Sequence, residues 1–264
     1  MGGVMYFDTH THYDDEKFSQ DRTEVLQSLK AAGVDRIVNC ACDSDSCKDT
    51  LRLMKTYDFV YGAMGVHPHS VKDLDVEAVS EIYRYCCGSD KVVAVGEIGL
   101  DYHYDLSPRD VQQEWFIEQI ELAKELELPI VVHSREAAMD TFRIIKESDA
   151  GAIGGIIHSY TGGPELAREY IRMGFYIGIG GMVTFPNVKK VLQTVREIDI
   201  HRIVLETDCP YLAPAPHRGQ RNDSRNLPCI AGVIAEIKGM TAEDVANITY
   251  ANAVKVFQIE REAE

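Results

Sequence analysis

The stretch that decides the fold is Met5-Tyr6-Phe7-Asp8-Thr9-His10-Thr11-His12. It begins as a short apolar run and ends in two histidines that are separated by one residue. In an extended strand, side chains two residues apart point to the same face. Asp8, His10 and His12 are therefore expected on one face, with both imidazoles at the C-terminal end of the strand. Two adjacent imidazoles form half of a metal site. In an isolated pair of this kind, one histidine more often lies in the core and the other in a solvated loop. Residues elsewhere in the chain must therefore distinguish a metal site from this alternative.

Seven further short, apolar stretches rich in β-branched residues follow this one, and helical patterns alternate with them. This alternation predicts parallel strands that are buried on both faces and covered by helices. The strands are expected at residues 34–40, 59–66, 91–97, 129–133, 154–158, 174–179 and 202–208. The helices are expected at 21–32, 44–57, 75–87, 107–126, 136–148, 164–173 and 188–197, and two more follow a polar loop that ends at Pro228.

Eight such repeats in 264 residues favour a single-domain (β/α)8 TIM barrel over residues 1–264, because this fold typically needs about 250 residues. A doubly wound open sheet is the alternative, but no Gly-x-Gly-x-x-Gly follows the first strand. The composition is 45% hydrophobic and 26% charged, which is typical of a soluble globular protein.

The sequence also bears on compartment and partners. We find no apolar run of the ~20 residues that a membrane span needs, and no signal peptide. Seven cysteines without a CxxC pair indicate reduced thiols, so we expect a cytoplasmic protein with no membrane partner. The net charge of −15 excludes a protein that binds nucleic acid through a broad basic face. Any polyanionic substrate must be held locally.

Ionisable residues lie at the ends of five of the predicted strands. Because active sites of such barrels lie at the C-terminal mouth, we expect these side chains to meet there. Desolvating so many titratable groups is costly without a counter-charge, and one or two bound cations would supply it. Each residue alone could be structural, but together they offer four imidazoles and two carboxylates, enough for two metals with one carboxylate left to bridge. The six candidates are His10, His12, Glu97, His133, His158 and Asp208.

Six motifs then follow one another along the chain. They are His10-Thr11-His12, Gly65-Val66-His67-Pro68-His69, Gly96-Glu97-Ile98-Gly99-Leu100-Asp101-Tyr102, Val132-His133-Ser134-Arg135, His158-Ser159-Tyr160 and Glu206-Thr207-Asp208-Cys209-Pro210-Tyr211-Leu212-Ala213-Pro214. Together they resemble the TatD family of metal-dependent deoxyribonucleases, and the resemblance covers essentially the whole chain.

This resemblance implies a TIM barrel of the metal-dependent hydrolase superfamily with a two-metal centre. One metal would be held by His10, His12, Glu97 and Asp208, and the other by Glu97, His133 and His158, with Glu97 as the bridging carboxylate. Members of the family remove nucleotides from DNA 3′ ends, and some act on RNA or at damaged sites. Others have been described as deacylating misacylated tRNA.

The family's phosphate-binding loop has a counterpart at His217-Arg218-Gly219-Gln220-Arg221-Asn222, which implies substrate contacts from Arg218, Arg221 and Asn222. Family members usually continue with Glu-Pro, whereas this chain continues with Asp223-Ser224, which keeps the acid and loses a rigid proline. Read from the residues alone, Arg218, Arg221 and Arg225 are a dense arginine cluster suited to phosphate oxygens. The alternative is a solvated charged loop. We expect His67 to contact a substrate phosphate rather than a metal.

These observations predict a divalent-metal-dependent phosphodiesterase, specifically a 3′–5′ exodeoxyribonuclease that acts on DNA and also on RNA. Asp208 would be its general base, Glu97 its bridging ligand, and Mg²⁺, Mn²⁺ or Zn²⁺ its two metal ions. The rival is a C–N or C–O hydrolase, such as a lactonase, a cyclic amidase or an aminoacyl-tRNA deacylase. It would need an oxyanion partner but no arginine-rich loop. A metal-bearing binding module without turnover is disfavoured, because every ligand position holds a competent residue. No oligomeric state can be predicted.

Overall fold

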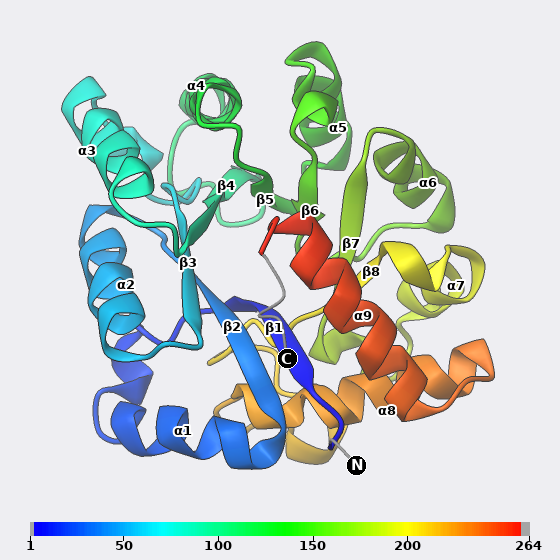
Figure 1. The fold of residues 1–264 in the computed structure, drawn as a ribbon. Coiled ribbons are helices and arrows are strands. Elements are labelled where there is room, and N and C mark those ends of the chain that lie inside the picture. Colours follow the sequence, from blue (N-terminus) through cyan, green and yellow to red (C-terminus); the bar gives the residue numbers. More distant parts are fainter. Residues whose placement is uncertain (1–2, 260–264) are drawn as a thin grey trace.

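The eight strands form one parallel sheet in the order of the sequence, β1-β2-β3-β4-β5-β6-β7-β8. This arrangement comes from a computed structural model, which describes residues 3–259. The sheet curls into a nearly closed barrel that the helices surround (Figure 1). The prediction of a (β/α)8 barrel is therefore confirmed. The strands are β1 Tyr6–Thr11, β2 Val34–Cys40, β3 Val60–Met64, β4 Val92–Asp101, β5 Ile130–Arg135, β6 Gly155–Ile157, β7 Phe175–Ile179 and β8 Ile203–Leu205.

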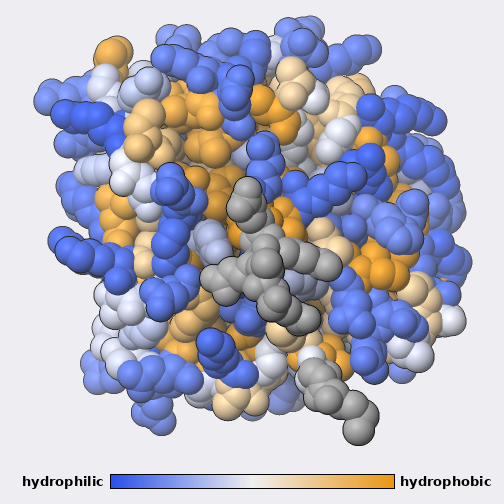
Figure 2. Space-filling model, in the orientation of Figure 1, coloured by the Kyte–Doolittle hydropathy of each residue, from blue (hydrophilic) through white to orange (hydrophobic). Residues whose placement is uncertain are grey.

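A helix follows each strand and covers the outside of the barrel. These helices are α1 Arg22–Leu29, α2 Ser44–Thr56, α3 Val76–Cys87, α4 Arg109–Glu125, α5 Ala138–Glu147, α6 Pro164–Arg172, α7 Lys189–Glu197 and α8 Leu227–Lys238, and α9 Ala242–Val256 comes after them. Among residues 3–259, no helix is long and apolar enough to cross a membrane. Figure 2 shows hydrophilic side chains over much of the periphery of the face seen in Figure 1, with hydrophobic ones between them.

Alternate residues of each strand serve two separate apolar layers. In β2, Ile37 packs outward with the helices, whereas Val38 points into the barrel. The inner layer extends to α9 and to Phe257 directly after it, whose ring lies 5.9 Å from that of Phe7 in β1. Asn252 of α9 donates hydrogen bonds to the backbone carbonyls of Ile200 and Ile203, just before and at the start of β8. Helix α9 thus closes the end of the barrel at which the strands begin, and leaves the C-terminal mouth for chemistry.

The seam between β8 and β1 is closed by irregular bonds rather than by a regular ladder. The amide of Asp208 donates to the carbonyl of His10 (3.0 Å), and the amide of His12 donates to the carbonyl of Cys209 (2.8 Å). Strand β8 was expected to reach residue 208, but it ends at Leu205. The physical reason is the buried carboxylate of Asp8, which accepts hydrogen bonds from the amide (2.9 Å) and hydroxyl (2.6 Å) of Thr207.

Strand β4 differs from its prediction in the opposite sense, because it continues past Glu97 to Asp101 and pairs with β5 as far as Arg135. A close approach at Gly99 permits this extension. Gly99 has φ +140°, and a Cβ atom there would lie only 2.0 Å from the carbonyl oxygen of His133. A side chain at position 99 would therefore push β5, and with it the His133 imidazole, away from β4.

We predict that Gly99→Ala lowers the free energy of unfolding by more than about 2 kcal/mol, because the backbone must adopt a strained conformation or move. Urea unfolding in the presence of a chelator measures this without a contribution from metal binding. Gly232→Ala in α8 is the control, since no atom lies within 4 Å of the added Cβ, and alanine should stabilise the helix by up to ~1 kcal/mol. Equal unfolding midpoints for the two variants would contradict the prediction.

Candidate metal centre

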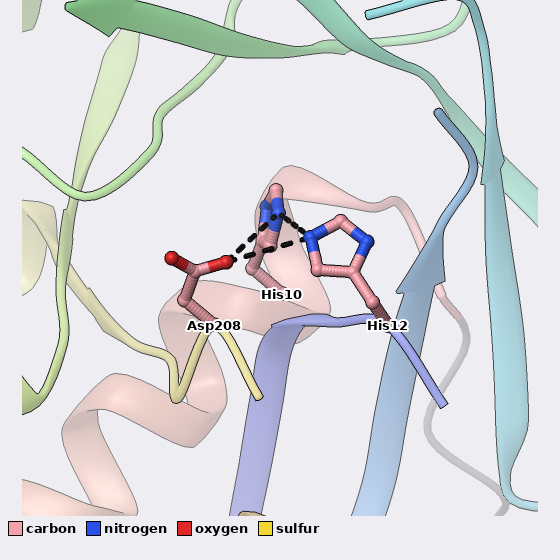
Figure 3. A group of neighbouring side chains, drawn as sticks. All are labelled: His10, His12 and Asp208. Carbon is pink, nitrogen blue, oxygen red and sulfur yellow. Dashed lines mark hydrogen bonds and ion pairs between the residues drawn. The ribbon is translucent and has the colours of Figure 1, made fainter. Parts of the chain in front are cut away.

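The first group of donors combines the end of β1 with the loop after β8. His10, His12 and Asp208 converge although almost 200 residues separate them (Figure 3). The Nε2 atoms of His10 and His12 lie 3.1 Å apart, and Asp208 Oδ1 lies 3.4 Å from His12 Nε2 and 3.9 Å from His10 Nε2. His12 Nδ1 is 2.8 Å from the carbonyl oxygen of Cys40. Because a carbonyl only accepts, Nδ1 carries the proton, and the Nε2 lone pair of the neutral ring is free for a metal.

Glu97 of β4 connects this group to a second one. Its Oε2 lies 3.2 Å from His10 Nε2, while its Oε1 lies 2.9 Å from Nδ1 of His133, at the end of β5. Two further imidazole nitrogens face Oε1, namely Nε2 of His67 at 3.7 Å and Nε2 of His158 at 3.8 Å. The ends of four other strands, β1, β3, β5 and β6, therefore bring imidazole nitrogens to this one carboxylate.

The spacing of these donors fits a coordinated cation. With bonds of ~2.1 Å to nitrogen and oxygen, neighbouring ligands of a tetrahedral or octahedral metal are about 3.0–3.4 Å apart. The Nε2 atoms of His10 and His12 are 3.1 Å apart, and each lies 3.2 to 3.9 Å from the nearest carboxylate oxygen of Glu97 and of Asp208. Glu97 and His10 are almost fully buried, so an unpaired charge would be costly there. The donor set is thus chemically and geometrically suited to a divalent ion.

Two further buried carboxylates, Asp101 and Glu206, lie against the imidazoles of His133 and His158. Asp101 Oδ2 lies 3.1 Å from Nε2 of His133, in the position expected of a carboxylate that fixes a ligand imidazole. Glu206 Oε2 lies 3.2 Å from Nδ1 of His158. The alignment of that pair is not that of a hydrogen bond, and neither atom has another partner among residues 3–259. The other oxygen of Glu206 accepts from the Ser159 amide at 2.6 Å.

Glu206 was not among the predicted site residues, although its position in the sequence carries a signal. Glu206 lies two residues before Asp208, so in an extended segment both carboxylates are directed to one side. Gly178 of β7 makes room for it, because a Cβ atom there would lie 2.3 Å from Glu206 Oε2. The sequence alone does not show that His158 lies against Glu206, because this contact depends on how the strands are arranged in space.

Burial and charge act in opposite directions on the ionisation of these groups. Burial alone would raise the pKa of the Glu97 carboxyl, but the imidazoles of His10 and His67 hold it well below its ordinary value. Burial would likewise raise the pKa of Asp208, and His158 reverses this. Burial would lower the pKa of His158, yet the carboxylates of Glu206 and Asp208 raise it to about 9. Without metal, the carboxylates are therefore balanced by protonated imidazole.

The predicted phosphate loop is only partly free for substrate. The Arg218 guanidinium lies 4.0 Å above the ring of Phe185, and no carboxylate within residues 3–259 pairs with it. Arg221 instead makes a two-pronged ion pair with Asp21 (2.7 and 2.6 Å). Arg225 pairs with Asp223 at 2.7 Å. The three arginines therefore do not form the single open cluster that their spacing suggested.

Two other residues that were expected to contact substrate, Asn222 and His67, are buried. The Asn222 amide donates to the carbonyls of Thr207 (2.8 Å) and Tyr211 (2.7 Å), and the residue is fully buried. In this structure Asn222 fastens the loop to the segment that carries Asp208. His67 lies within the same candidate metal group as Glu97 and His133, with its Nε2 atom 3.7 Å from Glu97 Oε1.

We predict that metal binding at pH 7 releases protons, because a ligand imidazole must lose its proton before it coordinates. His158, with its pKa of about 9, is protonated at pH 7 in the metal-free protein, so apparent affinity should fall as pH falls. Titration calorimetry with Zn²⁺ in two buffers of different ionisation enthalpy measures the release. His158→Ala should reduce it, and His201→Ala, at an exposed histidine paired with Asp199, should not. A binding heat independent of buffer would contradict the prediction.

Comparison with known proteins agrees with this geometry. Residues 7–258 match the model of a family described as TatD related DNase. The chain is 46% identical to the metal-dependent hydrolase YabD of Bacillus subtilis, over 97% of this chain and all of that protein. It is 35% identical to the metal-dependent hydrolase YcfH of Escherichia coli K12, over 97% of each.

A solved structure supports the same assignment. The TatD homologue YjjV of Escherichia coli K12 superposes with a TM-score of 0.91 and 29% identity, over 97% of this chain and 99% of that one. The fold, the convergent histidines and carboxylates, and the similarity along nearly the whole chain lead to one assignment. The chain belongs to the TatD family of metal-dependent hydrolases.

Proposed function

We propose that this protein hydrolyses phosphodiester bonds in nucleic acids and removes nucleotides from DNA 3′ ends, with RNA as a further substrate. The observation that carries the proposal is the Arg218 guanidinium, which has no carboxylate partner in the described part of the chain and lies on the loop after β8 that also supplies Asp208. A guanidinium without a carboxylate partner is available for the oxygens of a phosphate.

We infer two divalent ions, Mg²⁺, Mn²⁺ or Zn²⁺, that share Glu97. His10, His12 and Asp208 would hold one ion, and His133 with His158 the other, while the two oxygens of Glu97 face the two groups separately. Such ions would supply Lewis acidity, which makes a water molecule acidic enough to attack near neutral pH. The spread of the donors over both Glu97 oxygens supports a pair of ions rather than one.

Asp208 is suited to accept the proton of the attacking water. Its side chain is 16% exposed, against 4% for Glu97, so it borders the open mouth while Glu97 lies beneath. The neighbouring imidazoles hold its pKa below the ordinary value, so it is ionised at neutral pH. His67, which follows β3 and lies 3.7 Å from Glu97 Oε1 through its Nε2 atom, would contact the substrate phosphate.

The rival reaction is hydrolysis of a carbonyl compound by the same donors, as in a lactonase, a cyclic amidase or an aminoacyl-tRNA deacylase. Such a substrate carries no phosphate at the reacting centre and gives Arg218 no role. Metal-free protein should therefore be incubated with end-labelled single-stranded DNA, RNA, a misacylated tRNA and a lactone, with one divalent ion added at a time. Turnover of the lactone or the ester alone would overturn the phosphodiesterase proposal.

We expect Glu97→Gln to lower turnover of single-stranded DNA roughly 1,000-fold or more, because the variant loses the charge shared by both donor groups. Its affinity for metal should fall in parallel, by calorimetry. Glu236→Gln, at an exposed position of α8, is the matched control and should behave as wild type. Full turnover by Glu97→Gln would show that the proposed centre does not perform the reaction.

Arg218→Ala should raise KM for single-stranded DNA by roughly 10- to 100-fold, the value of a charge-assisted hydrogen bond. Its thermal unfolding should stay close to wild type, because the residue is exposed. Arg225→Ala is the comparison within the same loop, and its KM should change little since Asp223 already neutralises that guanidinium. Equal effects of both variants on KM would argue for a general charge effect instead of a phosphate contact.

A further inference from the structure

Two exposed tyrosines lie on opposite sides of the C-terminal mouth. Tyr104 follows β4 and is 53% exposed, and Tyr211 follows β8 and is 44% exposed. Four strand positions separate β4 from β8 in the eight-stranded order, so the two loops face each other across the barrel. The donor groups of the metal centre lie between them.

The position of Tyr104 is coupled to the metal centre through Asp101. One oxygen of Asp101 accepts hydrogen bonds from the backbone amides of His103 (2.9 Å) and Tyr104 (2.8 Å). Its other oxygen lies 3.1 Å from His133 Nε2 and 2.9 Å from His69 Nε2. The same carboxylate thus orients a metal-site imidazole and holds the loop that presents the tyrosine.

A cation stands against each ring. The Arg135 guanidinium lies 4.7 Å from the centre of the Tyr104 ring, and no carboxylate within residues 3–259 pairs with it. The Lys17 ammonium lies 4.1 Å from the centre of the Tyr211 ring. The hydroxyl of Tyr211 donates to Asp15 at 2.6 Å, and its ring lies 6.4 Å from that of His12. Tyr211 is therefore anchored beside the donor His12, and the Tyr104 ring lies 5.4 Å from that of His69, which shares the Asp101 carboxylate with the donor His133.

Exposed aromatic rings with adjacent cations are typical of surfaces that bind single-stranded nucleic acid. Bases stack on the rings, and the cations attract the phosphates between them. A protein with a net charge of −15 cannot hold a polyanion by bulk attraction, so such local contacts have to supply the binding. A duplex could not offer its stacked bases to two rings on opposite sides of the mouth.

We propose that Tyr104 with Arg135, and Tyr211 with Lys17, form two base-stacking subsites that hold the nucleotides on either side of the scissile phosphodiester. The bound strand then crosses the mouth from β4 to β8 as a single strand. The inference rests on the proposed phosphodiesterase function. It adds that the bases on either side of the cleaved bond are recognised, and it names the residues that bind them.

The experiment pairs enzyme variants with altered substrates. Product sizing on an intact single-stranded oligonucleotide with Mn²⁺ first identifies the bond that is cleaved. Two further oligonucleotides then carry one abasic residue on either side of that bond. KM and kcat are measured for all three with wild type, Tyr104→Ala, Tyr104→Phe, Tyr211→Ala and Tyr83→Ala. Tyr83 is a comparably exposed tyrosine (38%) on α3.

Tyr104→Ala should raise KM for the intact strand by at least about fivefold, the effect of losing one stacked base. One abasic strand should raise the KM of wild type to a similar degree, and it should raise the KM of Tyr104→Ala little further, because the partner ring is already absent. Tyr211→Ala should show the same coupling with the other abasic strand. Tyr104→Phe and Tyr83→Ala should keep the wild-type KM.

Two results would overturn the subsites while leaving the proposed function standing. The first is cleavage of the intact strand with an unchanged KM in Tyr104→Ala and Tyr211→Ala. The second is a KM that rises further in each variant with both abasic strands. The proposal instead expects one of the two abasic strands to cause little further rise. A wild-type protein that cleaves no strand under any divalent ion would instead overturn the proposed function, and the subsites with it.

Discussion

The carboxylate of Glu97, buried among imidazoles from four other strands, is the constraint on which the rest of the structure depends. Its two oxygens face different donor groups, and it lies where an isolated negative charge would be expensive to desolvate. In the metal-free protein, protonated imidazoles balance the negative charge of Glu97. In the metal-bound protein, a divalent ion would take over this role. The barrel provides this arrangement because eight parallel strands end at one rim, so residues far apart in sequence become neighbours.

Much of this arrangement could be predicted from the sequence. The order of strands and the six donors follow from short apolar runs that end in His, Glu or Asp, and the barrel rule places all those ends together. The end of β8 was wrong because a side chain, Asp8, captures the backbone of Thr207. Such a contact joins residues 199 positions apart, and no local pattern encodes it.

The supporting residues around the centre were harder to predict than the ligands. Glu206, just after β8, lies against His158 only because the fold brings the two together, so its place at the centre depends on neighbours in space. For the arginines of the loop after β8, the sequence suggested more free guanidinium groups than the structure shows. Their density in sequence suggested one open cluster, but Asp21 and Asp223 neutralise two of the three. Spacing along the chain shows which charges are near one another, and it does not show which are already paired.

The bonds that close the seam between β8 and β1 have a consequence for biosynthesis. The Asp208 amide reaches back to His10, and His12 reaches forward to Cys209, so the first and last strands and their donors meet in one place. A chain still emerging from the ribosome possesses two imidazoles at its start but lacks the acidic partner that completes their group. The group of His10, His12 and Asp208 can therefore form only after residue 208 has been added, so a chain that terminates before Asp208 lacks it.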